Sequence, residues 1–244
     1  MSNVIKYKIN TELLIEYLEN NIIEEFFIMG KKNDTTLEIS NFFPARVKKI
    51  KSKGKLIYFE LYNNVYILHS LGMTGRWENT EGKYNIGYIK ISNGNILWLR
   101  DPSQNSTFKV IQNPTLLQYK LDNLGLDILS EDFTFKKLKN KILQNGNINI
   151  TIFLMDQKII AGCDNILKSE ILYYAKLSPF RSTIKLNTEE IENLFTALLI
   201  IPRILYNNEK NHMITENKIY GQQFAKRIKT PDNRITYWDP LSQF

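Results

Sequence analysis

The segment from Leu154 to Leu172 constrains the fold of this chain more than any other stretch of its sequence. An apolar run leads into a short turn that reads Ala-Gly-x-x-Asn and ends at Asn165, and a second amphipathic run follows. An asparagine at a helix start can satisfy backbone N–H groups that have no partner within the helix. Those groups and the positive end of the helix dipole attract a phosphate oxygen. The pattern predicts two helices joined by an anion-binding turn, with an ordinary asparagine-capped helix hairpin as the equally open alternative.

The hydrophobic period changes along the rest of the chain. Residues 11–29 have helical spacing, with Asn10 or Thr11 as the expected cap, and residues 35–112 hold short alternating runs separated by turn residues. Helical spacing returns over residues 130–208, and a β-hairpin is expected near the C-terminus. We predict an α+β protein with three parts: an antiparallel β-sandwich over residues 1–115, a helical domain over residues 116–208 and a β-hairpin over residues 209–244.

Charge and cysteine content narrow the class of partner. The formal net charge of +7 favours a polyanion, nucleic acid before a membrane surface. A single cysteine, Cys163, excludes an internal disulfide and a cysteine-rich zinc site. No run approaches the roughly 18–20 apolar residues of a membrane span, and the start Met1-Ser2-Asn3 lacks a secretory signal pattern. We expect an intracellular protein, of cytoplasm or nucleus, without membrane association and without metal or cofactor.

The turn segment resembles the helix–two-turn–helix of the formamidopyrimidine-DNA glycosylase / endonuclease VIII family, whose members excise oxidised bases from DNA. Three further segments match the family's motifs in the expected order: Lys53-Gly54-Lys55 at a strand start, Leu71–Arg76 as its "L-G-M-S-G-R" turn, and Leu124–Phe133 as its linker. The resemblance implies an endonuclease VIII-like DNA glycosylase and abasic-site lyase in base excision repair. It would act as a monomer on double-stranded or damaged DNA.

The resemblance also implies which residues hold DNA phosphates. Lys55 takes the place of a lysine beside the damaged nucleotide, Asn165 lies in the turn, and Arg234 stands where the family's hairpin-tip arginine clamps a phosphate. Ser70 aligns with a phosphate-contacting histidine. His69 is one residue away, and a shift of one residue along a strand points a side chain to the opposite face, so we interpret His69 as structural.

The resemblance also implies that two apolar side chains occupy the space left in the base stack when a nucleotide is flipped out of it. Met73 matches the methionine that fills the hole in the base stack, although a lone methionine is more often part of a core. Phe108 could enter the stack as an apolar wedge. The arginine that would face the orphaned base is missing from the Asp101–Lys109 loop.

The C-terminus resembles a version of the family's zinc finger without zinc. Asp239 and Ser242 occupy the last two cysteine positions, and the first cysteine pair is absent. Zinc therefore lacks its thiolates. We expect this "zincless finger" to be held by packing through Tyr237 and Trp238.

The N-terminus departs from the family in its catalytic residues. Members carry Pro-Glu after Met removal, where the proline amine forms a Schiff base and the glutamate transfers protons; this chain has Ser2-Asn3. The α-amine of Ser2 remains a possible nucleophile, because such an amine has a pKa of about 8. Lys6 and Lys55 are alternative amines. Asn3 cannot exchange a proton as a carboxylate does, a loss that commonly costs roughly 10²–10⁴-fold in rate.

Three hypotheses therefore remain open from the sequence. The first is a glycosylase and lyase with weakened activity, which depends on Ser2, Asn3 and Lys55 as the catalytic positions. The second is a non-catalytic relative that binds damaged DNA or abasic sites. The third is a basic RNA- or membrane-binding protein that shares only fragments of the pattern.

Overall fold

The computed structural model describes residues 2–29, 39–214 and 216–244. Internal contacts divide the chain into two compact units. We call Lys6–Asp122 the sheet unit, and Asn123–Phe244 with the residues up to Ile5 the helical unit. The α+β prediction is confirmed, while the three-part division at residues 115 and 208 stays a prediction. Residues 35–38, where the predicted strand region begins, lie outside the described residues.

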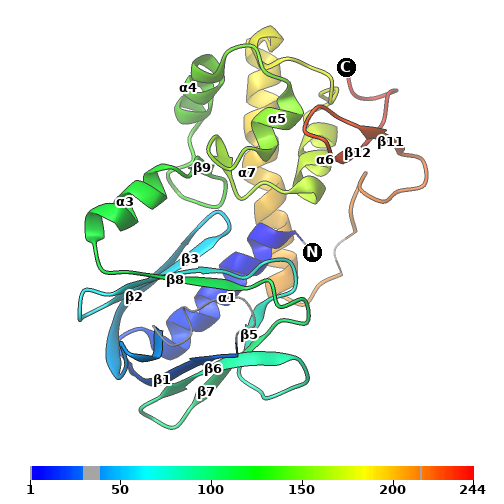
Figure 1. The fold of residues 1–244 in the computed structure, drawn as a ribbon. Helices are drawn as coiled ribbons and strands as arrows, with labels where there is room; N and C mark the ends of the chain where they lie inside the picture. Colours follow the sequence, from blue (N-terminus) through cyan, green and yellow to red (C-terminus); the bar gives the residue numbers. More distant parts are fainter. Residues whose placement is uncertain (1, 30–38, 215) are drawn as a thin grey trace. The chain divides into compact units, whose positions relative to one another are not determined.

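Among its described residues, the sheet unit contains one antiparallel sheet of eight strands, in the order β5-β7-β6-β1-β2-β3-β4-β8 (Figure 1). The brief pairing of β1 with β2, at Ile22–Arg46 and Ile23–Ala45, joins the two four-stranded halves of a β-sandwich. The strands are β1 (Ile22–Ile28), β2 (Ala45–Lys53), β3 (Leu56–Leu61), β4 (Tyr66–Ser70), β5 (Arg76–Glu78), β6 (Asn85–Ile91), β7 (Ile96–Arg100) and β8 (Thr107–Ile111).

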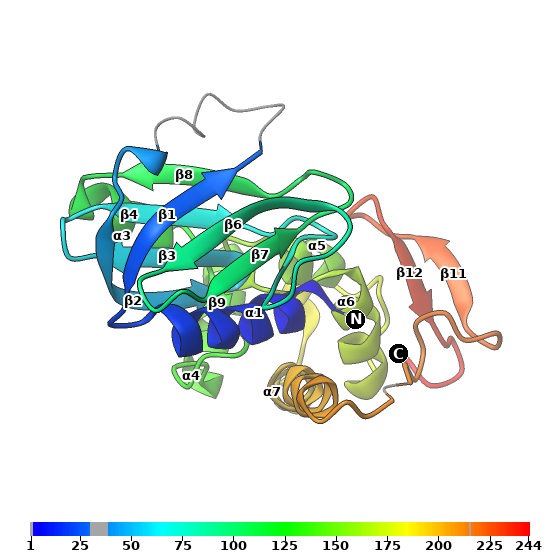
Figure 2. The same cartoon turned by 90° about the horizontal axis from the view of Figure 1, so that it is seen from below.

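The core of the sheet unit combines strand and helix side chains. Leu14 and Leu18 of helix α1 (Asn3–Leu18) belong to one buried cluster with Phe26 and Phe59 of the sheet. Figure 2 shows α1 running alongside the strands. Since burying a large apolar side chain contributes about 1.5–3 kcal/mol, this cluster is the main stabilising feature of the unit.

The sequence predicted a helix over residues 11–29, and both of the predicted ends are wrong. Helix α1 already begins at Asn3, and the expected caps instead bond back into it, from Asn10 to the carbonyl of Lys6 and from Thr11 to that of Tyr7. The helix ends at Leu18, and the Ile-Ile-Glu-Glu-Phe-Phe-Ile sequence that follows forms strand β1. Its β-branched and aromatic residues favour a strand, and pairing with β6 satisfies its backbone.

The helical unit holds the predicted pair of helices and the predicted hairpin. Its two helices around the turn are short and capped by side chains, and β11 and β12 pair antiparallel as expected. Among the described residues, no helix is long and apolar enough to cross a membrane. Its elements are β9 (Leu126–Asp127), α4 (Phe135–Asn145), α5 (Ile150–Met155), β10 (Ile160–Ala161), α6 (Asn165–Tyr174), the 3₁₀ helix η1 (Thr183–Lys185), α7 (Thr188–Lys210), β11 (Lys226–Lys229) and β12 (Ile235–Trp238). Helix α3 (Pro114–Asp122) belongs to the sheet unit.

Candidate nucleic-acid interface

The turn between α5 and α6 is held in shape by side-chain hydrogen bonds. The amide nitrogen of Gln157 donates to the carbonyls of Met155 and Cys163 at 3.0 and 2.9 Å, and its oxygen accepts from the N–H of Gly162 at 3.0 Å. Gly162 has a φ of 100°, which favours glycine. These bonds fix the position at which helix α6 begins.

The cap of helix α6 is Asp164, which corrects the expectation that Asn165 would cap it. Asp164 Oδ1 accepts from the N–H of Leu167 at 3.0 Å, and Asn165 is the first helical residue. The side chain of Asn165 is therefore available for another contact. Its Nδ2 donates to the carbonyl of Ile235 in the hairpin at 2.9 Å.

Asn165 and Arg234 are brought together by this contact, because Ile235 directly follows Arg234. The Arg234 side chain is exposed at the hairpin tip, where Asn233 has a φ of 62°. Beside them, Lys168 Nζ lies 2.6 Å from Asp232 Oδ2, and the two side chains are 0% and 4% exposed. The structure thus fixes the hairpin tip against the start of α6.

Hydrogen bonds hold the pKa of Asp232 below its usual value. Burial alone would raise that pKa, but the hydrogen bonds from Lys168 and Thr230 and the positive charge of Lys168 outweigh it. The carboxylate form is therefore the stable one at the hairpin tip.

The positions of the missing zinc ligands at the base of the hairpin are bonded to each other. Ser242 Oγ donates to Asp239 Oδ2 at 2.7 Å, and Asp239 N–H donates to Gln243 Oε1 at 2.7 Å. Within the described residues, no cluster of three histidine, cysteine, aspartate or glutamate side chains could hold a metal. A hydroxyl and one carboxylate that already bind each other do not fit zinc, which takes thiolates in such fingers.

Aromatic packing also supports the hairpin, as the sequence predicted. The rings of Tyr237 and Tyr220 lie 4.6 Å apart, and those of Trp238 and Phe180 lie 5.6 Å apart, edge to face. Such pairs contribute about 0.5–1.5 kcal/mol each beyond the area that they bury.

Glu170 of α6 anchors the segment before the hairpin and was not identified from the sequence. Its carboxylate accepts three consecutive backbone N–H groups, from Lys218, Ile219 and Tyr220, at 2.8, 3.0 and 2.8 Å. A glutamate on the buried face of a helix indicates that its carboxylate has hydrogen-bond partners. Those partners lie about fifty residues further along the chain, so the sequence pattern does not identify them.

The residues at the chain start are held by the same aspartate that caps α6. Ser2 Oγ donates to Asp164 Oδ2 at 2.7 Å, and the N–H of Asn3 donates to the same oxygen at 2.6 Å. Ser2 is 2% exposed and Asp164 6% exposed. Asp164 is thus a second residue that sequence reasoning missed, because 162 positions separate it from Ser2.

In the sheet unit, Lys6 supports the loop that carries Met73. Lys6 Nζ donates to the carbonyls of Gly72 and Met73, both at 2.8 Å. Burial lowers the pKa of Lys6 to about 8, partly opposed by the negative charge of Asp101. Its amine is therefore less strongly protonated than that of a surface lysine, although both carbonyls engage it.

Met73 itself is 77% exposed on a tight turn after strand β4. A Cβ on Gly75 would come within 2.2 Å of the Leu71 carbonyl oxygen, and a Cβ on Gly72, whose φ is +60°, would meet the Asn105 backbone at 3.0 Å. Both glycines are needed for this tight turn. The loop therefore presents an apolar side chain to solvent without support from a core.

Lys55 and Ser70 also lie in the sheet unit. Lys55 is half-buried in the turn between β2 and β3, where Lys53 pairs with Leu56 and Gly54 has a φ of 55°. Ser70 Oγ hydrogen-bonds the Tyr7 hydroxyl at 2.8 Å.

Phe108 lies in the core, which corrects its predicted role as a wedge. Its side chain is 8% exposed and its ring stacks on that of His69 at 4.0 Å with an angle of 3°. A ring covered in this way has no exposed face to insert between bases, and we therefore assign Phe108 to the core. Side chains alternate between the two faces of the strand from Thr107 to Lys109, but the sequence does not show which of these faces is buried.

The structural interpretation of His69 is confirmed. His69 is fully buried, Trp77 Nε1 donates to its Nε2 at 3.1 Å, and its Nδ1 lies 3.1 Å from the carbonyl of Thr107. Burial lowers its pKa to about 3, so the ring is neutral.

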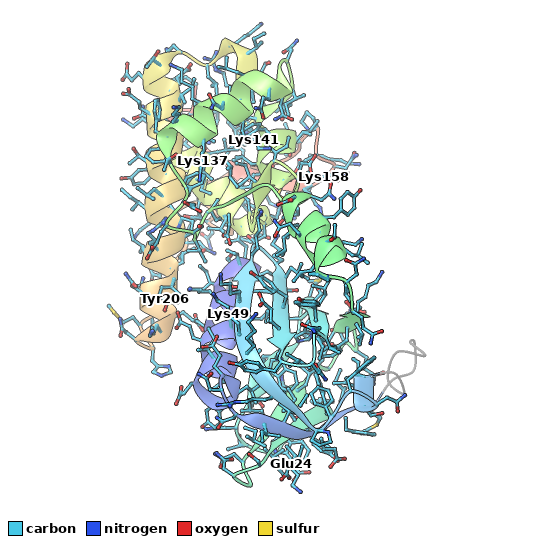
Figure 3. The ribbon with its side chains drawn as sticks, turned by 90° about the vertical axis from the view of Figure 1, so that its left-hand side faces the viewer. Glu24, Lys49, Lys137, Lys141, Lys158 and Tyr206 are labelled. Carbon is cyan, nitrogen blue, oxygen red and sulfur yellow. The ribbon has the colours of Figure 1, made fainter. Side chains whose placement is uncertain are left out.

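Basic side chains add positive charge to the helical unit. Figure 3 shows Lys137 and Lys141 on α4 and Lys158 in the turn after α5. Lys158 and Lys137 are exposed, and Lys137 forms an ion pair with Asp132 at 3.4 Å. Such solvated charges attract a polyanion over a distance rather than at one point.

Comparison with known sequences identifies the helical unit. A family model described as the formamidopyrimidine-DNA glycosylase H2TH domain matches residues 124–209. The formamidopyrimidine-DNA glycosylase of Mycoplasma genitalium is 32% identical over 151 residues, which are 59% of this chain and 52% of that protein. The protein of the same name from Ureaplasma parvum is 29% identical over 183 residues, 69% of this chain and 66% of that protein. The matched stretch spans about half to two thirds of the length of these relatives.

Solved structures match over nearly the whole chain. The MutM (Fpg) protein of Thermus thermophilus gives a TM-score of 0.79 at 20% identity, covering 99% of this chain and 98% of that one. Fpg of Lactococcus lactis, in a complex with DNA that contains an abasic site, gives 0.82 at 19% identity and covers 99% of both chains. At such identities the likeness concerns the fold. With the matched domain and the similar sequences, it supports the predicted resemblance: residues 124–209 form an H2TH domain of the formamidopyrimidine-DNA glycosylase type, and the chain has the fold of the formamidopyrimidine-DNA glycosylases.

Proposed function

We propose that this protein is a DNA repair glycosylase and abasic-site lyase that acts on oxidised bases. The proposal is supported by the names of its relatives, by the helix–two-turn–helix domain and by the net charge of +7. The observation that carries it is the pairing of Asn165 with the backbone beside Arg234, since this contact joins the anion-binding turn to an exposed arginine.

The proposed phosphate contacts are Arg234, Asn165 and Lys55. The Asn165 amide nitrogen donates one N–H to Ile235, and its second N–H can serve a phosphate oxygen. Arg234 supplies a charged, forked donor that suits phosphate. Phosphate contacts of this kind set the position of a protein on the duplex and carry no sequence information. Lys55 contributes a point charge from the sheet unit.

Met73 would take the space vacated by an everted nucleotide. Enzymes that act on a base must first move it out of the stack, at a cost of a few kcal/mol. An apolar side chain that is 77% exposed on a tight turn gains burial when it enters that space. Ser70 would lie in reach of the backbone near this loop, as the resemblance implies.

The chemistry would start at Ser2 once Met1 is removed. Its α-amine adds to C1′ of an abasic sugar aldehyde and forms an imine, which permits β-elimination of the 3′ phosphate. Excision of an intact base also requires opening the glycosidic bond, and Asn3 offers no proton for that step. We therefore propose an activity biased towards the lyase step, with weak excision of oxidised bases.

Borohydride trapping on DNA with a preformed abasic site tests this function. A covalent adduct with the mass of one chain plus DNA, mapped to Ser2, is the expected result. The mass of the purified chain must first establish that Met1 is absent. An adduct that maps to Lys6 or Lys55 would move the nucleophile to the sheet unit, and strong excision of intact oxidised bases would contradict the lyase bias.

The second candidate is a relative that binds abasic DNA without cutting it. It is favoured by one observation, the asparagine at position 3 where the family has a carboxylate. Tight binding to an abasic analogue, with no adduct on abasic DNA even at high protein concentration, would support this candidate over the enzyme.

A further inference from the structure

Asp164 makes an unusual pair of contacts for a helix cap. One carboxylate oxygen accepts the Leu167 N–H at 3.0 Å and so begins helix α6. The other accepts both Ser2 Oγ at 2.7 Å and the Asn3 N–H at 2.6 Å. A single carboxylate in the helical unit therefore lies against the first described residues of the chain, where the proposed nucleophile is located.

We propose that Asp164 does the work of the carboxylate that position 3 lacks, by holding Ser2 in place and accepting the proton that its α-ammonium must lose. The inference rests on the proposed lyase function and extends it. It gives Asp164 two roles: Asp164 positions Ser2, and it carries a proton from the α-ammonium to the departing hydroxyl. Hydrogen bonds to both Ser2 and Asn3 restrict rotation about the first peptide. Because the amine of Ser2 must reach C1′ of the sugar in one geometry, such a restriction raises the rate of the reaction.

The proton movements balance with Asp164 as the carrier. The Ser2 α-ammonium passes one proton to the carboxylate, and the amine lone pair then forms an N–C1′ bond while the C=O π bond of the aldehyde breaks. A proton shift from nitrogen to oxygen gives the carbinolamine. The proton held by Asp164 goes to the departing hydroxyl, which leaves as water, and the product is a protonated imine. The carboxylate is regenerated, and no redox partner is required.

The competing explanation is that Asp164 only caps two helices. Substitutions can separate the two roles, because a cap needs an acceptor and a proton carrier needs a carboxylate. Asp164→Asn keeps an acceptor oxygen for Leu167 and removes the charge. Asp164→Ser keeps a good cap for α6 and removes both the charge and the reach to Ser2. Asp156→Asn is the matched control, since Asp156 accepts the Lys158 N–H in the same turn and is exposed.

The first measurement is the rate of borohydride trapping against pH, with a chain that starts at Ser2. We expect Asp164→Asn to lower the maximal rate about 10–100-fold, with affinity for an abasic analogue within about twofold of the original. Loss of the nearby negative charge lowers the pKa of the α-amine, so the rise of the rate with pH moves down by about one pH unit. A chain that retains Met1 should give no adduct at position 2, and Asp156→Asn should behave like the original chain.

A second measurement keeps the inference testable if the lyase function fails. The pH dependence of acylation of the Ser2 α-amine, followed by mass spectrometry of the N-terminal peptide, reports its pKa without DNA. Absence of trapping by the original chain overturns the proposed function, whereas equal acylation midpoints in the original chain and in Asp164→Asn overturn the role of Asp164. Full activity with an unmoved pH profile in both Asp164 variants would likewise reduce Asp164 to a cap.

Discussion

Lys168 and Asp232 form a buried ion pair, Nζ to Oδ2 at 2.6 Å, that joins helix α6 to the tip of the C-terminal hairpin. The pair lies next to the exposed Arg234 and connects two elements that are 64 residues apart in the sequence. A buried pair is often no better than two apolar residues, but removal of one partner leaves an uncompensated charge. We infer that the pair sets the position of the hairpin tip rather than adding much net stability.

Substitution of Lys168 by Met is expected to destabilise the protein by about 3 kcal/mol, because Asp232 is then buried without its partner. Urea unfolding measures the change in the free energy of unfolding. The double variant Lys168→Met with Asp232→Leu should recover most of the loss. If the single variant were as stable as the original chain, the ion pair would not be a structural link.

The same pair predicts how stability depends on pH. The folded-state pKa of Asp232 is lowered, so its contribution is present above the unfolded value of about 4 and is lost as the pH falls through the folded value. The original chain should therefore lose more stability between pH 5 and pH 3 than the double variant does. Equal losses in the two proteins would contradict the lowered pKa.

The purified protein is expected to contain no stoichiometric zinc, and a chelator should leave its melting temperature unchanged. The reason is that Asp239 and Ser242 bind each other where the family has thiolates. Elemental analysis and thermal unfolding with and without chelator make the test. About one zinc per chain would show that other residues bind the metal.

Arg234→Ala should weaken binding to all duplexes to a similar degree and lower the salt slope of the affinity by about one ion. Asn165→Ala should weaken binding with little change of slope, because no charge is lost. Arg46→Ala is the control for loss of an arginine elsewhere, since its guanidinium lies over the Tyr62 ring. Unchanged affinity and slope after Arg234→Ala would remove Arg234 from the proposed interface.

Met73→Ala is expected to leave the melting temperature unchanged, because the side chain is 77% exposed. It should weaken binding to DNA with an abasic analogue about tenfold more than binding to undamaged duplex, since burial of a methionine is worth roughly 1.5–3 kcal/mol. Met213→Ala, at a methionine that is 59% exposed, is the matched control. Equal losses for both kinds of DNA would argue against a role in the vacated space.

The sequence predicted those features that depend on local pattern. The turn at Asn165, the alternating strands and the hairpin around residues 229–233 each leave a signature within a few residues, and all three are confirmed. Contacts over long separations leave no such signature, which is why Asp164 with Ser2 and Lys168 with Asp232 were not foreseen. Phe108 shows a second limit, because the strand pattern around it is compatible with burial of either face.

The last prediction concerns the weak point of the proposed chemistry, the Ser2-Asn3 start. Ser2→Pro with Asn3→Glu should raise excision of 5-hydroxyuracil or thymine glycol by about 10²–10⁴-fold, since a general acid–base is restored beside the amine. Cleavage at preformed abasic sites should rise much less, because the aldehyde is already present and the glycosidic bond need not be opened. Affinity for an abasic analogue should hardly change, since the phosphate contacts are untouched.

The two single substitutions, Asn3→Glu and Ser2→Pro, show which position limits excision. Asn3→Glu alone should account for most of the gain in excision, and Ser2→Pro alone for little of it, because the missing carboxylate and not the amine limits bond opening. Single-turnover excision and borohydride trapping on matched oligonucleotides separate the two steps. If the double variant excised no better than the original chain while still trapping on abasic DNA, the limit would lie in base recognition and not at the chain start.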